Sequence, residues 1–176
     1  MAEASQRMFF ALWPDDPTRN AIAACARTVV AQTGGREVVA ANLHLTLAFL
    51  GERPRSIVPH LCASASRIPV SPMRLLLDDV GCWRKTGIAW LATSAPCPEL
   101  SALHERLLSA LALLGIVIEE GRFVPHVTLA RRVVSRVALL LPQPIPWEVR
   151  SFALVASELG SAEARYRVLD AWPGVR

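Results

Sequence analysis

Residues 41–48 (ANLHLTLA) recur later in the chain, loosely, as residues 123–130 (FVPHVTLA). The two copies share a histidine, an apolar residue, a threonine, a leucine and an alanine in the same order. Side chains of a β-strand point alternately to the two faces of the sheet. We therefore expect the histidine and the threonine of each copy to share one face, while the apolar residues between them anchor the other face.

The first copy supplies His44 and Thr46, and the second supplies His126 and Thr128. A single histidine in a strand is usually structural, and threonine is a common strand residue. The repetition argues against that reading, because burying two imidazoles and two hydroxyls in an apolar interior would carry a desolvation cost. We predict that these four side chains line a solvent-filled cleft and contact a ligand.

Two imidazoles and two hydroxyls suit phosphodiester hydrolysis. That reaction needs a base for the nucleophile, an acid for the leaving oxygen and donors for the non-bridging oxygens. An unperturbed histidine pKa of ~6.5 makes both the base and the acid form accessible near neutral pH. Threonine hydroxyls are short, stiff donors that fit phosphate oxygens. The chemistry requires no metal ion, and we predict neither a metal nor a cofactor.

Bulk properties favour one cytoplasmic domain. A chain of 176 residues is long enough to bury one sizeable core. No apolar run approaches the ~20 residues that span a bilayer, and residues 1–7 lack the pattern of a signal peptide. The net charge of +4 suits a phosphate-bearing partner, although basicity alone is weak evidence for nucleic acid.

The remaining histidines and the cysteines indicate no metal centre. His60 and His104 lie in predicted helices without a metal-binding motif, so we expect structural or solvent-facing roles for them. The cysteines are widely spaced and form no C-x-x-C motif, which predicts inert thiols rather than a disulfide framework. They are Cys25, Cys62, Cys82 and Cys97.

Hydrophobic periodicity and turn residues predict an α+β fold. Helices are expected after an N-cap at Asp16, over residues 55–67 and over residues 98–114. Strands are expected over residues 8–13, 38–40, 43–50, 73–80, 88–93, 147–156 and 166–172, together with a strand at the second histidine. We predict a single domain, 1–176, with two pseudo-symmetric lobes of mixed, largely antiparallel sheet. Helices should cover the outer faces, with a groove at the centre.

These residues resemble the two-histidine (2H) phosphoesterase superfamily, and specifically the bacterial RNA 2',3'-cyclic phosphodiesterases, also called 2'-5' RNA ligases. The resemblance covers nearly the whole chain. The paired motifs in this order and spacing are its most specific part. It is carried by residues 7–11 (RMFFA), 42–52 (NLHLTLAFLGE), 77–83 (LDDVGCW), 125–131 (PHVTLAR) and 164–169 (ARYRVL).

The resemblance implies hydrolysis of a terminal 2',3'-cyclic phosphate on RNA to a 2'-phosphomonoester. It also implies that His44 donates a proton to the leaving 3'-oxygen, that His126 accepts one from water, and that Thr46 and Thr128 bind the phosphate. A 5'-hydroxyl in place of water would give the reverse 2'-5' ligation without ATP. The expected partners are RNA ends carrying a cyclic phosphate, such as those of tRNA fragments, with no membrane and no obligate protein partner.

Two further residues match the family as substrate contacts. Arg131 matches an arginine near the scissile phosphate, yet strict alternation from His126 puts it on the opposite face. It reaches the phosphate only if a bulge or strand end re-aims it, and otherwise it is a solvated arginine. Phe10 matches an aromatic residue that stacks on the terminal base, and its alternative role is core packing. Trp83 is a weaker stacking candidate.

Two other functions fit the same motifs. The first is a cyclic phosphodiesterase that acts on a small nucleotide or an ADP-ribose cyclic phosphate. The second is a non-catalytic protein that binds RNA ends and uses the histidine and threonine pairs to hold phosphate. Relative rates on mononucleotides and oligonucleotides separate the first from the RNA enzyme, and binding without turnover identifies the second.

Overall fold

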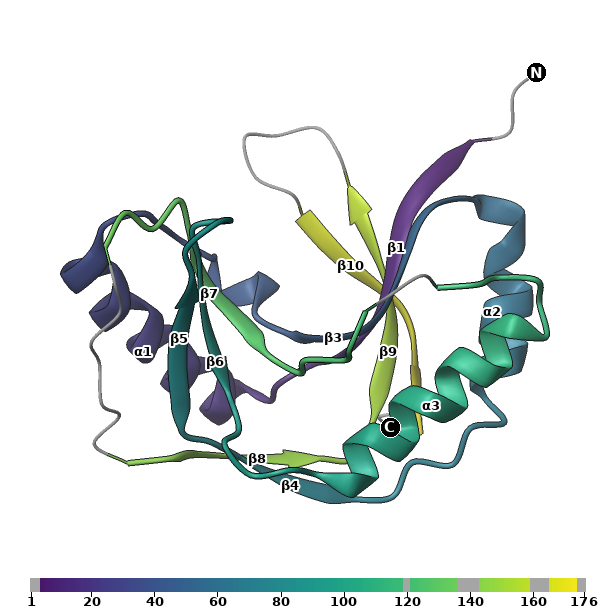
Figure 1. Cartoon of the computed structure of the whole chain (residues 1–176). Coiled ribbons are helices and arrows are strands. Elements are labelled where there is room, and N and C mark those ends of the chain that lie inside the picture. Colours follow the sequence, from purple (N-terminus) through teal and green to yellow (C-terminus); the bar gives the residue numbers. More distant parts are fainter. Residues whose placement is uncertain (1–3, 119–120, 136–142, 159–164, 174–176) are drawn as a thin grey trace.

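The computed structural model describes residues 4–118, 121–135, 143–158 and 165–173 (Figure 1). An eight-stranded sheet has the order β10-β9-β1-β3-β7-β6-β5, with β2 paired to β7, and β4 pairs with β8 in a second, two-stranded sheet. The strands are β1 (Ser5–Leu12), β2 (Arg36–Glu37), β3 (Leu45–Pro54), β4 (Met73–Leu77), β5 (Asp79–Trp83), β6 (Ile88–Ala92), β7 (Val127–Arg131), β8 (Ile145–Val149), β9 (Phe152–Glu158) and β10 (Arg165–Trp172). The helices are α1 (Asp16–Thr33), α2 (Val58–Ala65) and α3 (Pro98–Ala112).

The large sheet consists of two halves that share a single short contact. Strands β1, β3, β9 and β10 form one half, and β2, β5, β6 and β7 form the other (Figure 1). Only the pair Leu45–Val127, between β3 and β7, joins the halves among the described residues. Every pairing within the described residues is antiparallel. The prediction of an α+β fold with two lobes of largely antiparallel sheet is therefore confirmed.

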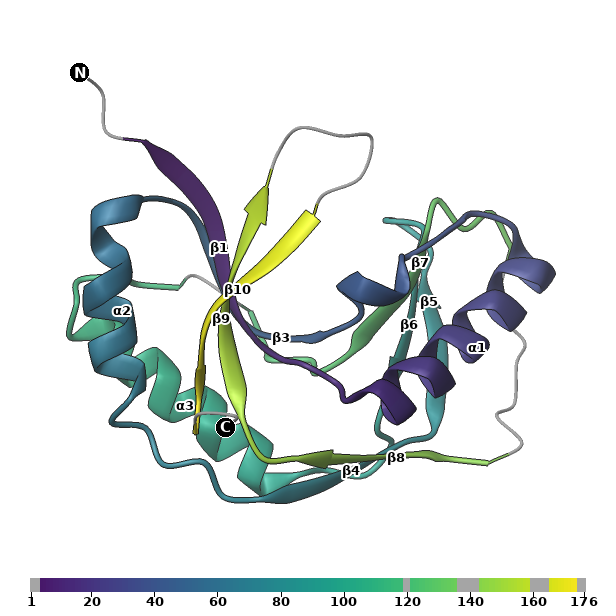
Figure 2. The ribbon, with the colours of Figure 1, turned by 180° about the vertical axis from the view of Figure 1, so that it is seen from behind.

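The helices lie at the two ends of the molecule, outside the sheet (Figure 2). α1 follows β1 in sequence, yet it packs against β7 of the other half and against β8 of the two-stranded sheet. α2 and α3 pack together, and α3 also packs against β3. The chain thus crosses between the halves several times before it ends. No helix in the described residues is long and apolar enough to cross a membrane.

Strand β1 separates two apolar clusters. Phe10 and Leu12 point into the main core, which also contains the buried apolar residues of both repeated stretches. Phe9 and Ala11 point the other way and join Ala153 and Val155 in a smaller cluster. This smaller cluster lies on the face that carries the histidines, because Phe9 contacts the imidazole of His44 at a ring-centroid distance of 4.8 Å.

Several predicted boundaries were wrong. Asp15, not Asp16, caps α1, because its extended backbone lets its carboxylate accept a hydrogen bond from the Thr18 amide at 3.0 Å. Residues 40–42 form a 3-10 turn, and the short strand lies at residues 36–37 instead of 38–40. The first histidine strand continues through Gly51 to Pro54, because the glycine adopts a φ of 69° where the pairing with β1 shifts register.

Two of the predicted strands are each divided into two shorter strands in the structure. Residues 73–80 divide into β4 and β5, which belong to different sheets. The division falls at Asp78, whose carboxylate accepts hydrogen bonds from the amide and the hydroxyl of Ser94, both at 2.7 Å. Residues 147–156 divide in the same way into β8 and β9. Hydrophobic alternation alone does not show such divisions, because the apolar pattern of the first strand runs on into the second.

Candidate active site

The repeated stretches meet where the two halves of the sheet join. Leu45 of β3 lies directly across from Val127 of antiparallel β7. Residues opposite each other in an antiparallel pair point to the same face. The residues that flank this pair therefore share the other face, and the register brings the histidine of each copy beside the threonine of the other.

Burial follows the predicted alternation in both copies. His44, Thr46, His126 and Thr128 are all half-buried. The apolar residues next to them are completely or almost completely buried, namely Leu43, Leu45, Leu47, Val127 and Leu129. The four polar side chains are thus held on a partly solvated surface by two strands whose opposite face is anchored in the main core.

Both imidazoles are held by the same local contact. Nδ1 of His44 lies 2.6 Å from the carbonyl oxygen of Asn42, and Nδ1 of His126 lies 2.7 Å from that of Val124. A carbonyl only accepts, so each Nδ1 carries the proton and each neutral ring keeps a lone pair on Nε2. In the first copy the hydroxyl of Thr46 donates to this Nε2 at 3.1 Å.

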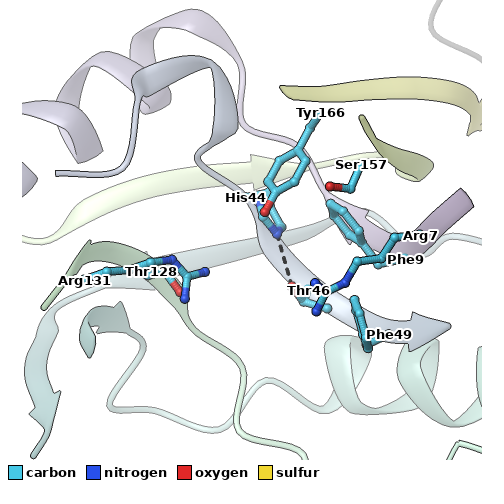
Figure 3. A pocket seen from close by; sticks show the side chains of 9 residues that line it. All are labelled: Arg7, Phe9, His44, Thr46, Phe49, Thr128, Arg131, Ser157 and Tyr166. Atoms are coloured by element: carbon cyan, nitrogen blue, oxygen red, sulfur yellow. Dashed lines mark hydrogen bonds between the residues drawn. The ribbon is translucent and has the colours of Figure 1, made fainter. Parts of the chain in front are cut away.

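A cavity of about 440 Å³ opens beside these residues (Figure 3), and its volume is in the range of small-ligand sites. It is lined by Arg7, Phe9, His44, Thr46, Phe49, Thr128, Arg131, Ser157 and Tyr166. Three of the four motif residues thus face it directly. His126 is not among the lining residues, and the β3–β7 register places it across from Thr46, which does line the cavity.

A bulge in β7 explains how Arg131 reaches the cavity. Thr128 pairs with Trp90 and Ala130 pairs with Ala89, so Leu129 is an extra residue in β7. Leu129 and Ala130 are both buried, and Arg131, after them, turns back to the histidine face. The alternative left open for Arg131, that a bulge re-aims it, is the one the structure adopts.

Strand β3 has the matching bulge. Thr46 pairs with Ala11 and Ala48 pairs with Phe10, which leaves Leu47 as the extra residue. Phe49 is thereby turned to the cavity, at the position that Arg131 occupies in the second copy. The carbonyls of both bulged residues find partners: His104 donates from Nδ1 to Leu47 at 2.8 Å, and the amide of Val38 donates to Leu129 at 2.9 Å.

Phe10 does not lie in the cavity. It is 1% exposed and packs against Phe152 and Trp172 in the main core, so its candidate role in base stacking is corrected to core packing. The neighbouring Phe9 lines the cavity instead. Two adjacent phenylalanines in a strand face opposite ways, and the sequence alone did not show which one faces the site.

Aromatic rings contact both imidazoles. Trp13 stacks on His44 with an interplanar angle of 9°, and the rings of Phe9 and Tyr166 also contact it. Trp83 meets His126 edge-on at 4.5 Å, so this tryptophan contacts a site histidine. Of the cavity-lining residues, the sequence analysis missed Arg7, Phe9, Phe49, Ser157 and Tyr166. Arg7, Phe9, Phe49 and Tyr166 fall inside the stretches that carried the family resemblance.

The model of one family matches most of the chain, over residues 14–160, and it describes the 2'-5' RNA ligase superfamily. The chain belongs to the 2'-5' RNA ligase superfamily. A protein of Escherichia coli strain K12 named RNA 2',3'-cyclic phosphodiesterase is 36% identical over 169 residues, which cover 95% of this chain and 96% of that protein. The predicted membership in this group of phosphoesterases is therefore confirmed.

Two further similarities extend over nearly full lengths. A Thermus thermophilus protein, also named RNA 2',3'-cyclic phosphodiesterase, is 34% identical and aligns over 93% of this chain and 88% of its own length. The crystal structure of Escherichia coli LigT complexed with 3'-AMP matches with a TM-score of 0.85 and 34% identity, over 98% of this chain and 100% of that one. The relatives' names agree with the prediction of an enzyme of this class.

In this member of the 2'-5' RNA ligase superfamily, the surroundings of both site histidines disfavour imidazolium. Burial, reinforced by the neighbouring His126 and Arg131, lowers the pKa of His44 to about 4, although the bond to Asn42 opposes the shift. The pKa of His126 is also lowered, first by burial and then by Arg131. Both rings are therefore neutral at pH 7 when nothing is bound, and a bound anion would favour their protonation.

The other two histidines and the four cysteines do not line the cavity. His104 is buried and stacks on Phe123 at 3.9 Å, and His60 is exposed. All four cysteines are free thiols, and burial raises the pKa of Cys25 to about 11. Within the described part of the chain, no three histidine, cysteine, aspartate or glutamate residues are grouped as metal ligands would be.

Proposed function

We propose that this chain hydrolyses the 2',3'-cyclic phosphate at the end of an RNA and leaves a 2'-phosphomonoester. The observation that carries the proposal is the pair of imidazoles, each with Nδ1 held by a carbonyl. His44 lines one cavity with Thr46, Thr128 and Arg131, and the β3–β7 register sets His126 across from Thr46. The names of the curated relatives support the same substrate class. So do the crystal structures of LigT complexed with 3'-AMP and with phosphate.

In the proposed reaction, Nε2 of His126 takes a proton from water while the water oxygen attacks phosphorus. The bond to the 3'-oxygen breaks, and Nε2 of His44 donates a proton to that oxygen. Hydroxyls of Thr46 and Thr128 and the guanidinium of Arg131 donate to the non-bridging oxygens, where negative charge builds up. A 5'-hydroxyl that attacks in place of water would give the 2'-5' linkage.

The low pKa of His44, which burial causes, sets a condition on its role as the acid. A neutral imidazole has no proton on Nε2 to give to the leaving oxygen. The negative charge of the bound phosphate favours imidazolium and raises this pKa. We therefore infer that substrate binding is accompanied by the uptake of a proton on His44.

The proposed substrate also leads to inferences about the natural RNA, the compartment and the domain organisation. We infer that the chain acts on RNA ends such as those of tRNA fragments, and that it does so in the cytoplasm. We also infer that residues 1–176 work as one bilobal domain without an obligate protein partner. Both copies of the motif are needed for the proposed chemistry, so neither half would hydrolyse the substrate alone.

Replacement of either histidine tests the proposal. An oligonucleotide with a 2',3'-cyclic phosphate end is incubated with the wild type and with His44→Gln, His126→Gln and His60→Gln. Loss of an acid or base costs roughly 10²–10⁴-fold in rate, so the first two variants should lose at least two orders of magnitude. The exposed His60 serves as the matched control and should retain wild-type activity. The wild-type product should carry its phosphate on the 2'-hydroxyl.

Wild-type activity in either His44→Gln or His126→Gln would overturn the assignment, as would a wild type that does not open the cyclic end. The same assay with and without EDTA tests the absence of a metal requirement. We expect equal rates, since the proposed acid, base and phosphate donors are all side chains.

A further inference from the structure

Arg7 and Phe49 form a distinct part of the cavity wall. The guanidinium carbon of Arg7 lies 4.7 Å from the ring centroid of Phe49, and both residues line the cavity. Figure 3 shows them on the side of Thr46 opposite to Arg131 and Thr128. We call this pair the Arg7–Phe49 platform.

The platform arises from the bulge in β3, which is the counterpart of the bulge in β7 that brings Arg131 into the cavity. In the second copy the bulge turns an arginine to the site, whereas in the first copy it turns Phe49, which is 38% exposed. The cation on this side comes from the neighbouring strand β1, where Arg7 lies over the ring. The cavity therefore has a guanidinium at each end, with His44 and Thr46 between them.

The charge of Arg7 is left available by its surroundings. Glu52 is its cross-strand neighbour, yet within the described residues no carboxylate forms an ion pair with Arg7. A guanidinium that stacks by its face on an aromatic ring still presents the N–H groups on its edge. Such an edge matches the oxygens of a phosphate group, and an exposed aromatic ring provides a stacking surface for a base.

We propose that the Arg7–Phe49 platform binds the second nucleotide from the RNA end. The inference rests on the proposed function, which places the terminal cyclic phosphate at the histidines. Arg7 then contacts the phosphodiester that precedes the terminal nucleotide, and Phe49 stacks on the base of the second one. A mononucleotide lacks both groups, so the platform makes oligonucleotide ends better substrates than small cyclic nucleotides.

The test compares kcat/KM for a 2',3'-cyclic mononucleotide with that for a dinucleotide bearing the same terminal base and cyclic phosphate. The proteins are the wild type, Arg7→Gln, Phe49→Leu and the control Arg74→Gln, whose exposed arginine pairs with Glu148 outside the cavity. We expect the wild type to prefer the dinucleotide by tenfold or more. Arg7→Gln and Phe49→Leu should each reduce this ratio several-fold, and Arg74→Gln should preserve it.

Salt adds a second readout, because the Arg7 contact is ionic. The dinucleotide preference of the wild type should fall as NaCl rises, and that of Arg7→Gln should respond less. A wild-type ratio near one would overturn the platform while leaving the proposed function in place. Ratios unchanged in both platform variants would also overturn it, as would equal losses on the two substrates. Failure of the wild type to open either substrate would instead reject the proposed function.

Discussion

At the scale of single residues, the carbonyl two positions before each histidine decides which ring nitrogen carries the proton. Asn42 and Val124 provide these carbonyls, so Nε2 of each ring is the basic atom when the ring is neutral. Burial adds a preference for the neutral form in both rings. The two rings therefore share a tautomer and a preference for the neutral form, and we infer that the bound substrate determines which ring is protonated and acts as the acid.

The titration of His44 tests this account of its environment. In the free protein its Cε1–H resonance should titrate well below pH 6.5, near pH 4, and saturating inorganic phosphate should move the midpoint upward. His44→Gln identifies the resonance by its disappearance. A midpoint near 6.5 in the free protein, or one that phosphate leaves in place, would contradict the account.

The same depressed pKa predicts how stability depends on pH. Between about pH 6.5 and pH 4 the unfolded chain binds a proton at His44 that the folded chain does not bind, so the free energy of unfolding falls as the pH falls through this window. Urea denaturation at several pH values measures it. His44→Gln should show a weaker fall over this window, and an equal fall in both proteins would contradict the prediction.

At the scale of elements, the two bulges give the site its shape. Each adds one residue to a motif strand and so brings the side chain two positions later to the histidine face. Each also frees a carbonyl, and the carbonyl of Leu47 is satisfied by His104 from α3. His104 stacks in turn on Phe123, three residues before His126, and so connects the first motif to the segment that leads into the second.

Removal of this imidazole should destabilise the fold. His104→Leu leaves the carbonyl of Leu47 without its partner, and an unsatisfied buried polar group costs about 1–3 kcal/mol. Urea denaturation should show that loss. The control His60→Leu, also on a helix but exposed, should stay within about 0.5 kcal/mol of the wild type. Equal stabilities of the two variants would show that the buried bond contributes nothing.

The sequence predicted the parts of the site that depend on one strand at a time. Alternation placed the motif histidines and threonines correctly, because each apolar neighbour had to be buried. Strict alternation placed Arg131 on the face opposite to the histidine, because it cannot include a bulge, which arises only from the pairing between two strands. It also failed to choose between Phe9 and Phe10, since both faces of β1 are apolar and only the packing of β9 and β10 decides.

At the scale of the whole molecule, the site depends on the joint between two half-sheets. The pair Leu45–Val127 is the one ladder contact between the halves in the described residues, and the apolar sides of both strands enter one main core. The helices lie outside this joint (Figure 2), and His44, Thr46 and Thr128 line the cavity. The repeated stretches predicted such an arrangement of two lobes, but the crossing of α1 to the opposite half depends on the complete fold.

The central claim is that one phosphate is held between the two motifs. The most direct measurement is a crystal structure of the complex with a dinucleotide that ends in a 2'-phosphate. We expect its phosphorus to lie between His44 and His126, with phosphate oxygens within about 2.6–3.2 Å of both Nε2 atoms and of the hydroxyls of Thr46 and Thr128. A phosphate that contacts only one copy of the motif, or that binds away from both, would contradict the claim.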